Sequence, residues 1–238
     1  MDILYDIVTT VEGGVVMRYK NYLFDFDYTL ADATNGIVES VNHALSKMNF
    51  SLPSREEIRR TIGMSLSESF TYLTKNKEPE LQAMYIRLFK EKADEVMTQN
   101  TQLFQDTVHV LSCLKSKDIN TGIVTTKYRY RIVDVLQKHQ ITHLIDIIVG
   151  GDDVKNAKPD PEALLKAIEL LGASKDDVLY IGDSMIDART ANNANVDFIA
   201  VTTGTTAKDD FMQLPHIAVI DSLGALLSMV ERCNHFIQ

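Results

Sequence analysis

Short apolar runs alternate with helical patterns over most of the chain. The runs predict strands at residues 21–25, 119–124, 145–149, 178–181, 197–202 and 217–220. Apolar residues three and four apart predict helices near 106–117, 129–139, 160–172, 186–194 and 222–232. Such alternation is typical of parallel strands with helices on both faces of the sheet, and continuous apolar strands fit a sheet buried on both sides. The pattern therefore predicts an α/β fold with a Rossmann-like parallel sheet.

One region, from about residue 33 to 103, carries helical signals only. Residues 34–48 and 79–99 place apolar side chains at helical spacing, and Ser54 with Glu57 three residues later forms a capping-box pattern. An all-helical insertion after the first core strand predicts a small second domain. The expected division is an N-terminal extension at 1–16, an α/β core at 17–32 and 104–238, and a helical cap at 33–103.

The first sixteen residues precede a second methionine, Met17, which comes just before the first strong strand. They could be an added strand or a mobile arm, or translation could begin at Met17 instead. The sequence leaves these alternatives open. The N-terminus carries no early Lys or Arg, which argues against a secretory signal. No apolar run approaches the roughly 18–20 residues that a membrane helix needs.

Composition limits the classes of partner. The 238 residues include 24 Lys and Arg against 33 Asp and Glu, which gives a net charge of −9. Nucleic acids and anionic membranes require a basic surface, so neither is an expected partner. A small anionic substrate stays possible, because a metal ion and a few lysines can reverse the potential locally. The two cysteines, Cys113 and Cys233, form neither a disulfide scaffold nor a zinc site, and we expect a reducing, cytoplasmic location.

Polar residues follow four of the predicted strands. In an open parallel sheet, ligands bind beyond the carboxyl ends of the strands. Each group alone fits an ordinary turn or helix cap, but four such groups at four strand ends are improbable by chance. The strand ends therefore predict a site for phosphate or metal chemistry. The candidate residues are Asp25, Asp27, Thr125, Thr126, Lys127, Lys158, Asp183 and Asp187.

The motifs FDFDYT, IVTT, AKPDP and IGDSMID, in this order, resemble those of the haloacid dehalogenase superfamily of phosphohydrolases. The resemblance covers about residues 21–232, and the helical insertion resembles the cap of the phosphoglycolate phosphatase-like branch. It implies a Mg²⁺-dependent phosphatase that hydrolyses a small phosphorylated metabolite through an aspartyl-phosphate intermediate. Phosphoglycolate is one candidate substrate, and the protein is expected to be a monomer or homodimer.

The resemblance also implies roles for the acidic residues. Asp25 is the expected nucleophile, and Asp27 the acid that protonates the leaving group and then activates water. Mg²⁺ takes oxygen ligands, which the Asp25 carboxylate, the Asp27 backbone carbonyl and Asp183 would supply. Asp187, one turn after Asp183, would support the metal site indirectly.

The remaining candidates are implied to bind the phosphoryl group. Thr125, Thr126 and Lys127, with their backbone N–H groups, would bind its oxygens beside a helix N-terminus. Lys158 would neutralise the negative charge that develops near Asp25 in the transition state.

Two comparisons with other activities of the family narrow the reaction. Dehalogenases lack an acid at the second aspartate, so Asp27 favours phosphoryl transfer. Sugar phosphomutases carry a histidine and a lysine at the positions of Ile37 and Ile62, which makes a mutase unlikely. Inorganic pyrophosphatase and nucleotidase activities stay open. Tyr28 stands where many members carry glycine, and it either narrows the entrance or touches the substrate or the cap.

Specificity is expected to lie in the cap. Arg59 or Arg60, in the loop region at 59–65, could hold a substrate carboxylate, although exposed helix arginines are the more common case. A different class of protein, a phosphorylation-switched binding module like a response-regulator receiver, also clusters aspartates around a lysine. The motif order, the acid at Asp27 and the helical insertion favour an enzyme over this alternative.

Overall fold

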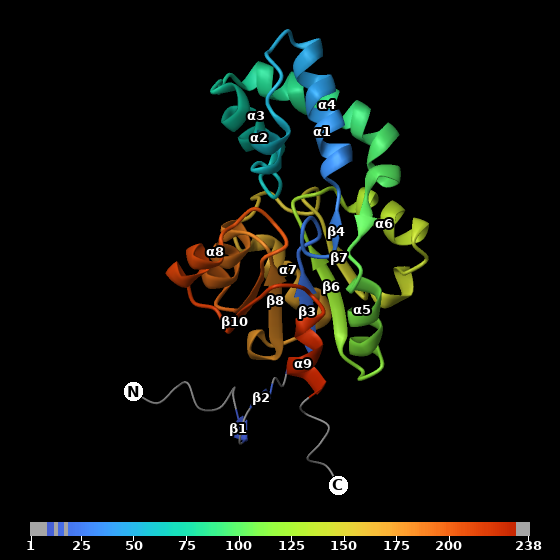
Figure 1. Cartoon of the computed structure of the whole chain (residues 1–238), viewed down its shortest axis with the longest axis vertical. Helices are drawn as coiled ribbons and strands as arrows, with labels where there is room; N and C mark the ends of the chain where they lie inside the picture. Colours follow the sequence, from blue (N-terminus) through green and yellow to red (C-terminus); the bar gives the residue numbers. More distant parts are fainter. Residues whose placement is uncertain (1–8, 12–13, 17–18, 232–238) are drawn as a thin grey trace.

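A computed structural model describes residues 9–11, 14–16 and 19–231. Its centre is a six-stranded parallel sheet in the order β10-β9-β8-β3-β6-β7 (Figure 1). The strands are β3 (Asn21–Phe24), β6 (Asn120–Val124), β7 (Ile147–Val149), β8 (Val178–Gly182), β9 (Asp197–Val201) and β10 (Ala218–Ile220). All six lie at the predicted places, and the predicted α/β fold is confirmed.

Helices cover both faces of this sheet. They are α5 (Thr107–Lys115), α6 (Arg129–Lys138), α7 (Glu162–Leu171), α8 (Met185–Ala194) and α9 (Ala225–Glu231). Because successive side chains of a strand point to opposite faces, Phe24 packs in one hydrophobic cluster with residues of α5, α6 and α9. Leu23 packs in the other with residues of α7 and α8. The sheet is therefore buried on both sides, as its continuous apolar strands predict.

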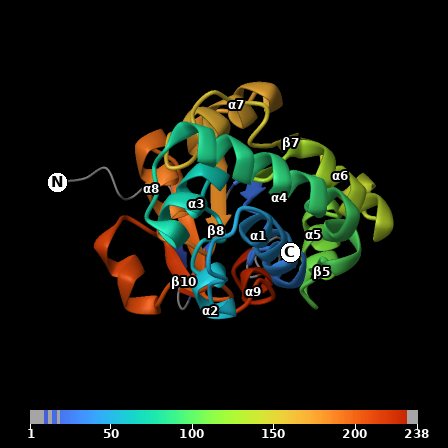
Figure 2. The same cartoon turned by 90° about the horizontal axis from the view of Figure 1, so that it is seen from above.

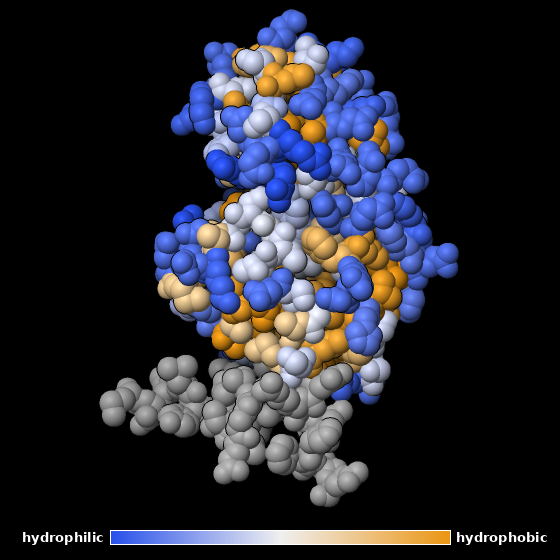
Figure 3. All heavy atoms as spheres, in the orientation of Figure 1, coloured by the Kyte–Doolittle hydropathy of each residue, from blue (hydrophilic) through white to orange (hydrophobic). Residues whose placement is uncertain are grey.

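Four further helices form a group beyond the carboxyl ends of the strands (Figures 1 and 2). They are α1 (Thr34–Lys47), α2 (Arg55–Arg59), α3 (Leu66–Thr74) and α4 (Pro79–Asn100). This helical group has a hydrophobic cluster of its own, which includes Val41, Phe70 and Phe89, and its visible surface is mostly hydrophilic (Figure 3). The predicted capping box at Ser54 is present, and Ser65 forms a second one at the start of α3.

A short antiparallel pair of strands joins the helical group to the sheet. β4 (Ala31–Asp32) leads into α1, and β5 (Gln102–Leu103) follows α4. The sequence did not predict this strand pair, because a two-residue strand is too short to produce a periodic pattern. Three short 3₁₀ helices lie in the connections, η1 (Thr142–Leu144), η2 (Lys175–Asp177) and η3 (Lys208–Gln213).

The N-terminal extension contains a two-stranded antiparallel hairpin, β1 (Thr9–Val11) with β2 (Gly14–Val16). Neither strand belongs to the six-stranded sheet. Met17 and Cys233 lie outside the described residues. Of the helices that the structure describes, none is long and apolar enough to cross a bilayer.

Candidate active site

Three buried carboxylates meet at the carboxyl ends of β3 and β8. These strands are neighbours in the sheet, and the Asp25 backbone N–H donates to the Ile181 carbonyl at 2.8 Å. Asp25, Asp183 and Asp187 each offer one oxygen, and these oxygens all lie within 4.8 Å of one another. The structure therefore brings together three of the predicted residues from two segments far apart in the chain.

Lys158 supplies the positive charge of this cluster. Its Nζ lies 2.8 Å from Asp25 Oδ1, 2.6 Å from Asp187 Oδ1 and 3.0 Å from the Tyr180 hydroxyl. Burial alone would lower the pKa of Lys158, but Asp187 and Asp25 outweigh it and raise the pKa well above its ordinary value. Lys158 is thus a buried ammonium held between two carboxylates.

One ammonium does not balance three carboxylates. Burial raises the pKa of Asp25 to about 7, although the Lys158 ammonium opposes the shift. Burial and the charge of Asp187 likewise raise the pKa of Asp183 well above its usual range. Both shifts express the cost of holding several negative charges out of water. A divalent cation would remove that cost, and clustered carboxylate oxygens are the donors that hard cations prefer. The residues present therefore fit a divalent metal site.

Asp187 is held from both sides. Its Oδ1 accepts from Lys158 and from the Tyr180 hydroxyl at 2.9 Å. Its Oδ2 accepts from the backbone N–H of Ser184, the N-cap of α8, at 3.2 Å, and the Ser184 side chain completes a capping box. With both oxygens already engaged, this carboxylate is well placed to orient Lys158, a contact that the sequence did not predict, and its indirect role at the metal site stays a prediction.

The carboxylate of Asp183 lies against a glycine in the loop after β9. A Cβ atom added to Gly204 would stand 1.9 Å from Asp183 Oδ2, so only glycine allows this approach. On the other side, the Thr29 hydroxyl donates to Asp183 Oδ1 at 3.4 Å. The sequence does not single out Gly204 or Tyr180. Thr29 ends the motif FDFDYT, but no role was predicted for it. Tyr180 lies inside a predicted strand, and Gly204 has no local pattern that would distinguish it.

Asp27 and Lys127 form a second ion pair nearby. Lys127 Nζ lies 2.9 Å from Asp27 Oδ2, and both side chains are largely buried. Asp27 Oδ1 is buried and has no hydrogen-bond partner among the described residues. Lys127 is therefore bound to Asp27, a contact that the sequence did not predict. In the same loop, the hydroxyl of Thr125, another predicted site residue, accepts a hydrogen bond from the Lys127 backbone N–H at 3.3 Å.

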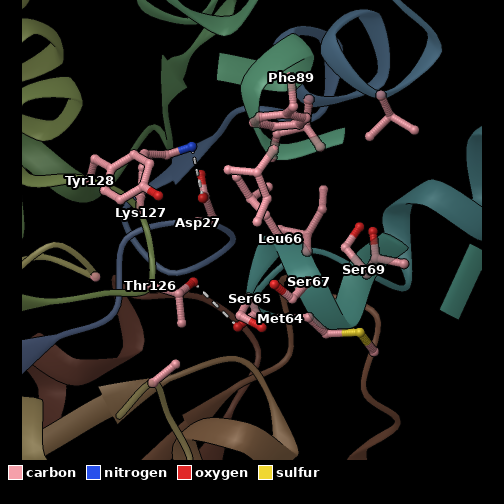
Figure 4. A pocket seen from close by; sticks show the side chains of 18 of the residues that line it. Asp27, Met64, Ser65, Leu66, Ser67, Ser69, Phe89, Thr126, Lys127 and Tyr128 are labelled. Atoms are coloured by element: carbon pink, nitrogen blue, oxygen red, sulfur yellow. Dashed lines mark hydrogen bonds and ion pairs between the residues drawn. The ribbon is translucent and has the colours of Figure 1, made fainter. Parts of the chain in front are cut away.

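A cavity of about 210 Å³ opens between these core residues and the helical group. Asp27, Thr126 and Lys127 line its core side, as Figure 4 shows. The Thr126 hydroxyl donates to the Gly63 carbonyl at 3.3 Å, which connects the core to the loop before α3. Three of the predicted residues thus border the space beneath the helices, whereas Asp25 and Thr125 are not among the residues that line it.

Tyr28 contacts the helical group. Its φ of +62° lies in the left-handed region, which costs a non-glycine residue about 1–2 kcal/mol and explains why glycine suits this position. Its hydroxyl lies 2.7 Å from Thr34 Oγ1 and accepts from Arg59 Nε at 3.1 Å. Arg59 is thus engaged with Tyr28, and Arg60 lies 3.7 Å from Glu56. Neither arginine lines the cavity, which disfavours the hypothesis that one of them holds a substrate carboxylate.

The amino-acid sequence from β3 to β9 matches a known protein family. The sequence model of the haloacid dehalogenase-like hydrolases matches residues 22–201, which run from β3 to the end of β9. The chain belongs to this family. The predicted resemblance is therefore confirmed, as is the prediction that the chain is an enzyme, a hydrolase.

Individual members of the haloacid dehalogenase-like family are similar over nearly the whole chain. The pyrophosphatase PpaX of Bacillus cereus (strain B4264) is 30% identical over 218 residues, which cover 92% of this chain and 99% of the relative. The crystal structure of a haloacid dehalogenase-like hydrolase from Bacteroides fragilis has a TM-score of 0.86 and 44% identity, and covers 87% of this chain and 99% of its own. A predicted phosphatase from Clostridium acetobutylicum shares the fold with a TM-score of 0.82 at 24% identity, over 88% of this chain and 97% of its own.

Proposed function

We propose that this hydrolase is a Mg²⁺-dependent phosphatase that cleaves a small phosphate monoester through an aspartyl-phosphate at Asp25. The observation that carries the proposal is the buried cluster of Asp25, Asp183 and Asp187 around Lys158. Asp27, two residues after Asp25, lines the adjacent cavity. This arrangement supports the proposal, because phosphoryl transfer to a carboxylate requires a nucleophile, a cation site and an acid close together.

In the first step, a carboxylate oxygen of Asp25 attacks phosphorus and the bond from phosphorus to the ester oxygen breaks. Asp27 donates a proton to the departing oxygen, which leaves as an alcohol. The buried Oδ1 of Asp27 supports this role, because it has no hydrogen-bond partner among the described residues and so has capacity left for a substrate atom. In the second step, Asp27 takes a proton from water, whose oxygen attacks phosphorus. Inorganic phosphate leaves and the Asp25 carboxylate is restored.

The cation is assigned to Asp25, Asp183 and the backbone carbonyl of Asp27, with Asp187 acting indirectly. When bound, Mg²⁺ would screen the repulsion between the nucleophile and the phosphoryl oxygens. Lys158 holds the Asp25 carboxylate in place and neutralises charge beside it. Its own orientation comes from Asp187 and Tyr180.

The phosphoryl oxygens are assigned to the loop after β6, where Thr125, Thr126 and Lys127 precede α6. The helical group at 33–103 is proposed to act as a cap that keeps bulk water away from the phosphoenzyme and opens for release. Its contacts with the core through Gly63 and Tyr28 support this. We expect a small phosphorylated metabolite as substrate and a cytoplasmic location.

Pyrophosphate hydrolysis is the second candidate function. It is favoured by the similarity to the pyrophosphatase PpaX, which extends over 92% of this chain. The same nucleophile and acid would serve this reaction, with phosphate as the leaving group. The two candidate reactions differ in the charge of the leaving group, which is an alcohol in the first and a phosphate anion in the second.

The direct test is release of phosphate from small phosphate esters, nucleoside monophosphates and pyrophosphate, with Mg²⁺ or with EDTA. Asp25→Asn should abolish turnover, whereas Asp209→Asn, an exposed aspartate in η3, is the matched control and should not. Turnover that persists in Asp25→Asn would overturn the proposal. A lasting phosphorylated Asp25 without release would also overturn it, and would favour a phosphorylation-switched binding module.

A further inference from the structure

The cavity beside the proposed catalytic residues is lined mainly by apolar side chains on its helical side. Figure 4 shows Leu66 and Phe89 on this side, and the Asp27–Lys127 pair on the core side. The apolar lining includes Ile37, Val41, Ile62, Leu66, Ile86 and Phe89. A leaving group that departs from phosphorus near Asp27 therefore enters a largely apolar space.

Every charged side chain in the described lining of the cavity already has a partner. These side chains are Asp27, Lys127 and Arg131. Lys127 pairs with Asp27 at 2.9 Å. Arg131 Nη2 lies 2.7 Å from Asp94 Oδ1 and donates to the Lys90 carbonyl at 3.2 Å, so its charge is directed toward α4. The lining offers no uncommitted cation to a second anionic group on the substrate.

The polar groups on the helical side are hydroxyls. Thr61 donates its hydroxyl proton to the Ile58 carbonyl at 2.7 Å, and Ser65 donates to Glu68 at 2.7 Å. Because a hydroxyl oxygen has two lone pairs, both side chains can still accept a hydrogen bond. Thr61 and Ser65 therefore suit a neutral hydroxyl that donates to them, and they offer no proton to a carboxylate, which can only accept. Ser67 and Ser69 also line this side of the cavity.

We propose that the cavity selects phosphate monoesters whose leaving group is a small uncharged alcohol, and that it discriminates against phosphoglycolate and pyrophosphate. The inference rests on the proposed phosphatase function and names its substrate class. Where an anionic leaving group gives up water to contact this lining, no uncommitted cation replaces that water, which is unfavourable. The volume of about 210 Å³ is below the roughly 300–1,000 Å³ of pockets for drug-sized ligands, so the alcohol is small.

The test compares kcat/KM for glycerol 3-phosphate and 3-phosphoglycerate. The two esters share a carbon skeleton and a phosphorylated position, and differ by a hydroxymethyl group in place of a carboxylate. We expect glycerol 3-phosphate to be preferred by about tenfold or more, where each factor of ten corresponds to ~1.4 kcal/mol. n-Butyl phosphate should also exceed phosphoglycolate and pyrophosphate. Equal values, or a preference for the anionic members, would overturn the inference.

A matched pair of variants tests the cause of the preference. Met64 lines the cavity but does not pack in the core of the helical group. Met64→Lys adds a cation and should reduce the ratio of kcat/KM for glycerol 3-phosphate to that for 3-phosphoglycerate by at least about tenfold. Met64→Gln adds polarity without charge and should change kcat/KM for both substrates by the same factor. An unchanged ratio in a folded Met64→Lys would contradict the inference. If that variant does not fold, the comparison of esters on the unsubstituted enzyme still decides.

The same panel separates the two proposals. Asp25-dependent phosphate release from any ester supports the phosphatase function, whatever the order of substrates. The order of substrates then tests only the leaving-group inference. If the enzyme hydrolyses none of the esters, both the phosphatase function and the leaving-group inference are overturned.

Discussion

Replacing Lys158 by methionine tests how the carboxylate cluster is held. Methionine keeps much of the apolar stem but removes the ammonium that lies 2.8 Å from Asp25 and 2.6 Å from Asp187. Removing one partner of a buried ion pair typically costs about 3–5 kcal/mol, because the other charge stays buried and unpaired. For a chain of this size, each kcal/mol lowers the melting temperature by about 2–4 °C. Lys158→Met should therefore melt about 6–20 °C below the unsubstituted protein in EDTA.

Mg²⁺ should restore part of this loss. With the ammonium gone, Asp25, Asp183 and Asp187 hold more uncompensated negative charge, so a divalent cation should stabilise the variant more than the unsubstituted protein. Arg131→Met is the matched control, because this cation is also buried in an ion pair, with Asp94, and neither residue is assigned to the metal site. The control should lose stability that Mg²⁺ does not restore.

The assay is thermal unfolding of the three proteins by circular dichroism, in EDTA and in saturating Mg²⁺. If Lys158→Met melts within about 2 °C of the unsubstituted protein in EDTA, the buried-pair argument is wrong. If Mg²⁺ raises the melting temperature of Arg131→Met as much as that of Lys158→Met, the metal does not bind at the assigned carboxylates.

Three further substitutions have defined outcomes. Gly204→Ala forces the Asp183 carboxylate to move and should weaken Mg²⁺ binding by about 10–100-fold in calorimetric titration; unchanged affinity would remove Asp183 from the metal site. Asp27→Asn should lower kcat about 10²–10⁴-fold without unfolding the chain, and a smaller loss would leave the acid unassigned. Tyr28→Phe removes the hydroxyl that Arg59 contacts and should cost about 1 kcal/mol in urea unfolding. In a double-mutant cycle with Arg59→Ala the two losses should not add, and full additivity would show that the contact contributes nothing.

The parts of the fold that the sequence predicted are those with strong local patterns. The strands of the sheet are buried on both faces, so their sequences are continuous apolar runs with clear ends. The capping box at Ser54 is a local hydrogen-bond pattern and is equally visible in sequence. β5 is only two residues long, and its partner β4 is separated from it along the chain by the whole helical group. No short stretch of sequence therefore contains the pattern of this strand pair.

The candidate site likewise contains residues that the sequence predicts and residues that only the folded structure reveals. Asp25, Lys158 and Asp183 follow predicted strands, and the parallel topology places them at one edge of the sheet. Gly204 and Tyr180 were missed, because their importance depends on distances between segments. A glycine after β9 is unremarkable until the fold places its Cα against the Asp183 carboxylate.

Two contacts changed the expected roles of individual residues. The resemblance implies that Lys127 binds phosphate, and the structure pairs it with Asp27, the proposed acid. Arg59 was a candidate for a substrate carboxylate, and it contacts Tyr28 outside the lining of the cavity. A single sequence shows that a cation is present in a segment but does not show which anion it meets.

The central claim is that Asp25 becomes phosphorylated during turnover. The most direct measurement is a rapid acid quench of the enzyme with Mg²⁺ and an isotopically labelled phosphate ester, followed by mass spectrometry of the peptide that contains Asp25. The account predicts a phosphoryl group on Asp25 that forms before free phosphate appears and decays at the rate of turnover. Phosphate release with no label on Asp25 at any time, at a rate unaffected by Asp25→Asn, would contradict it.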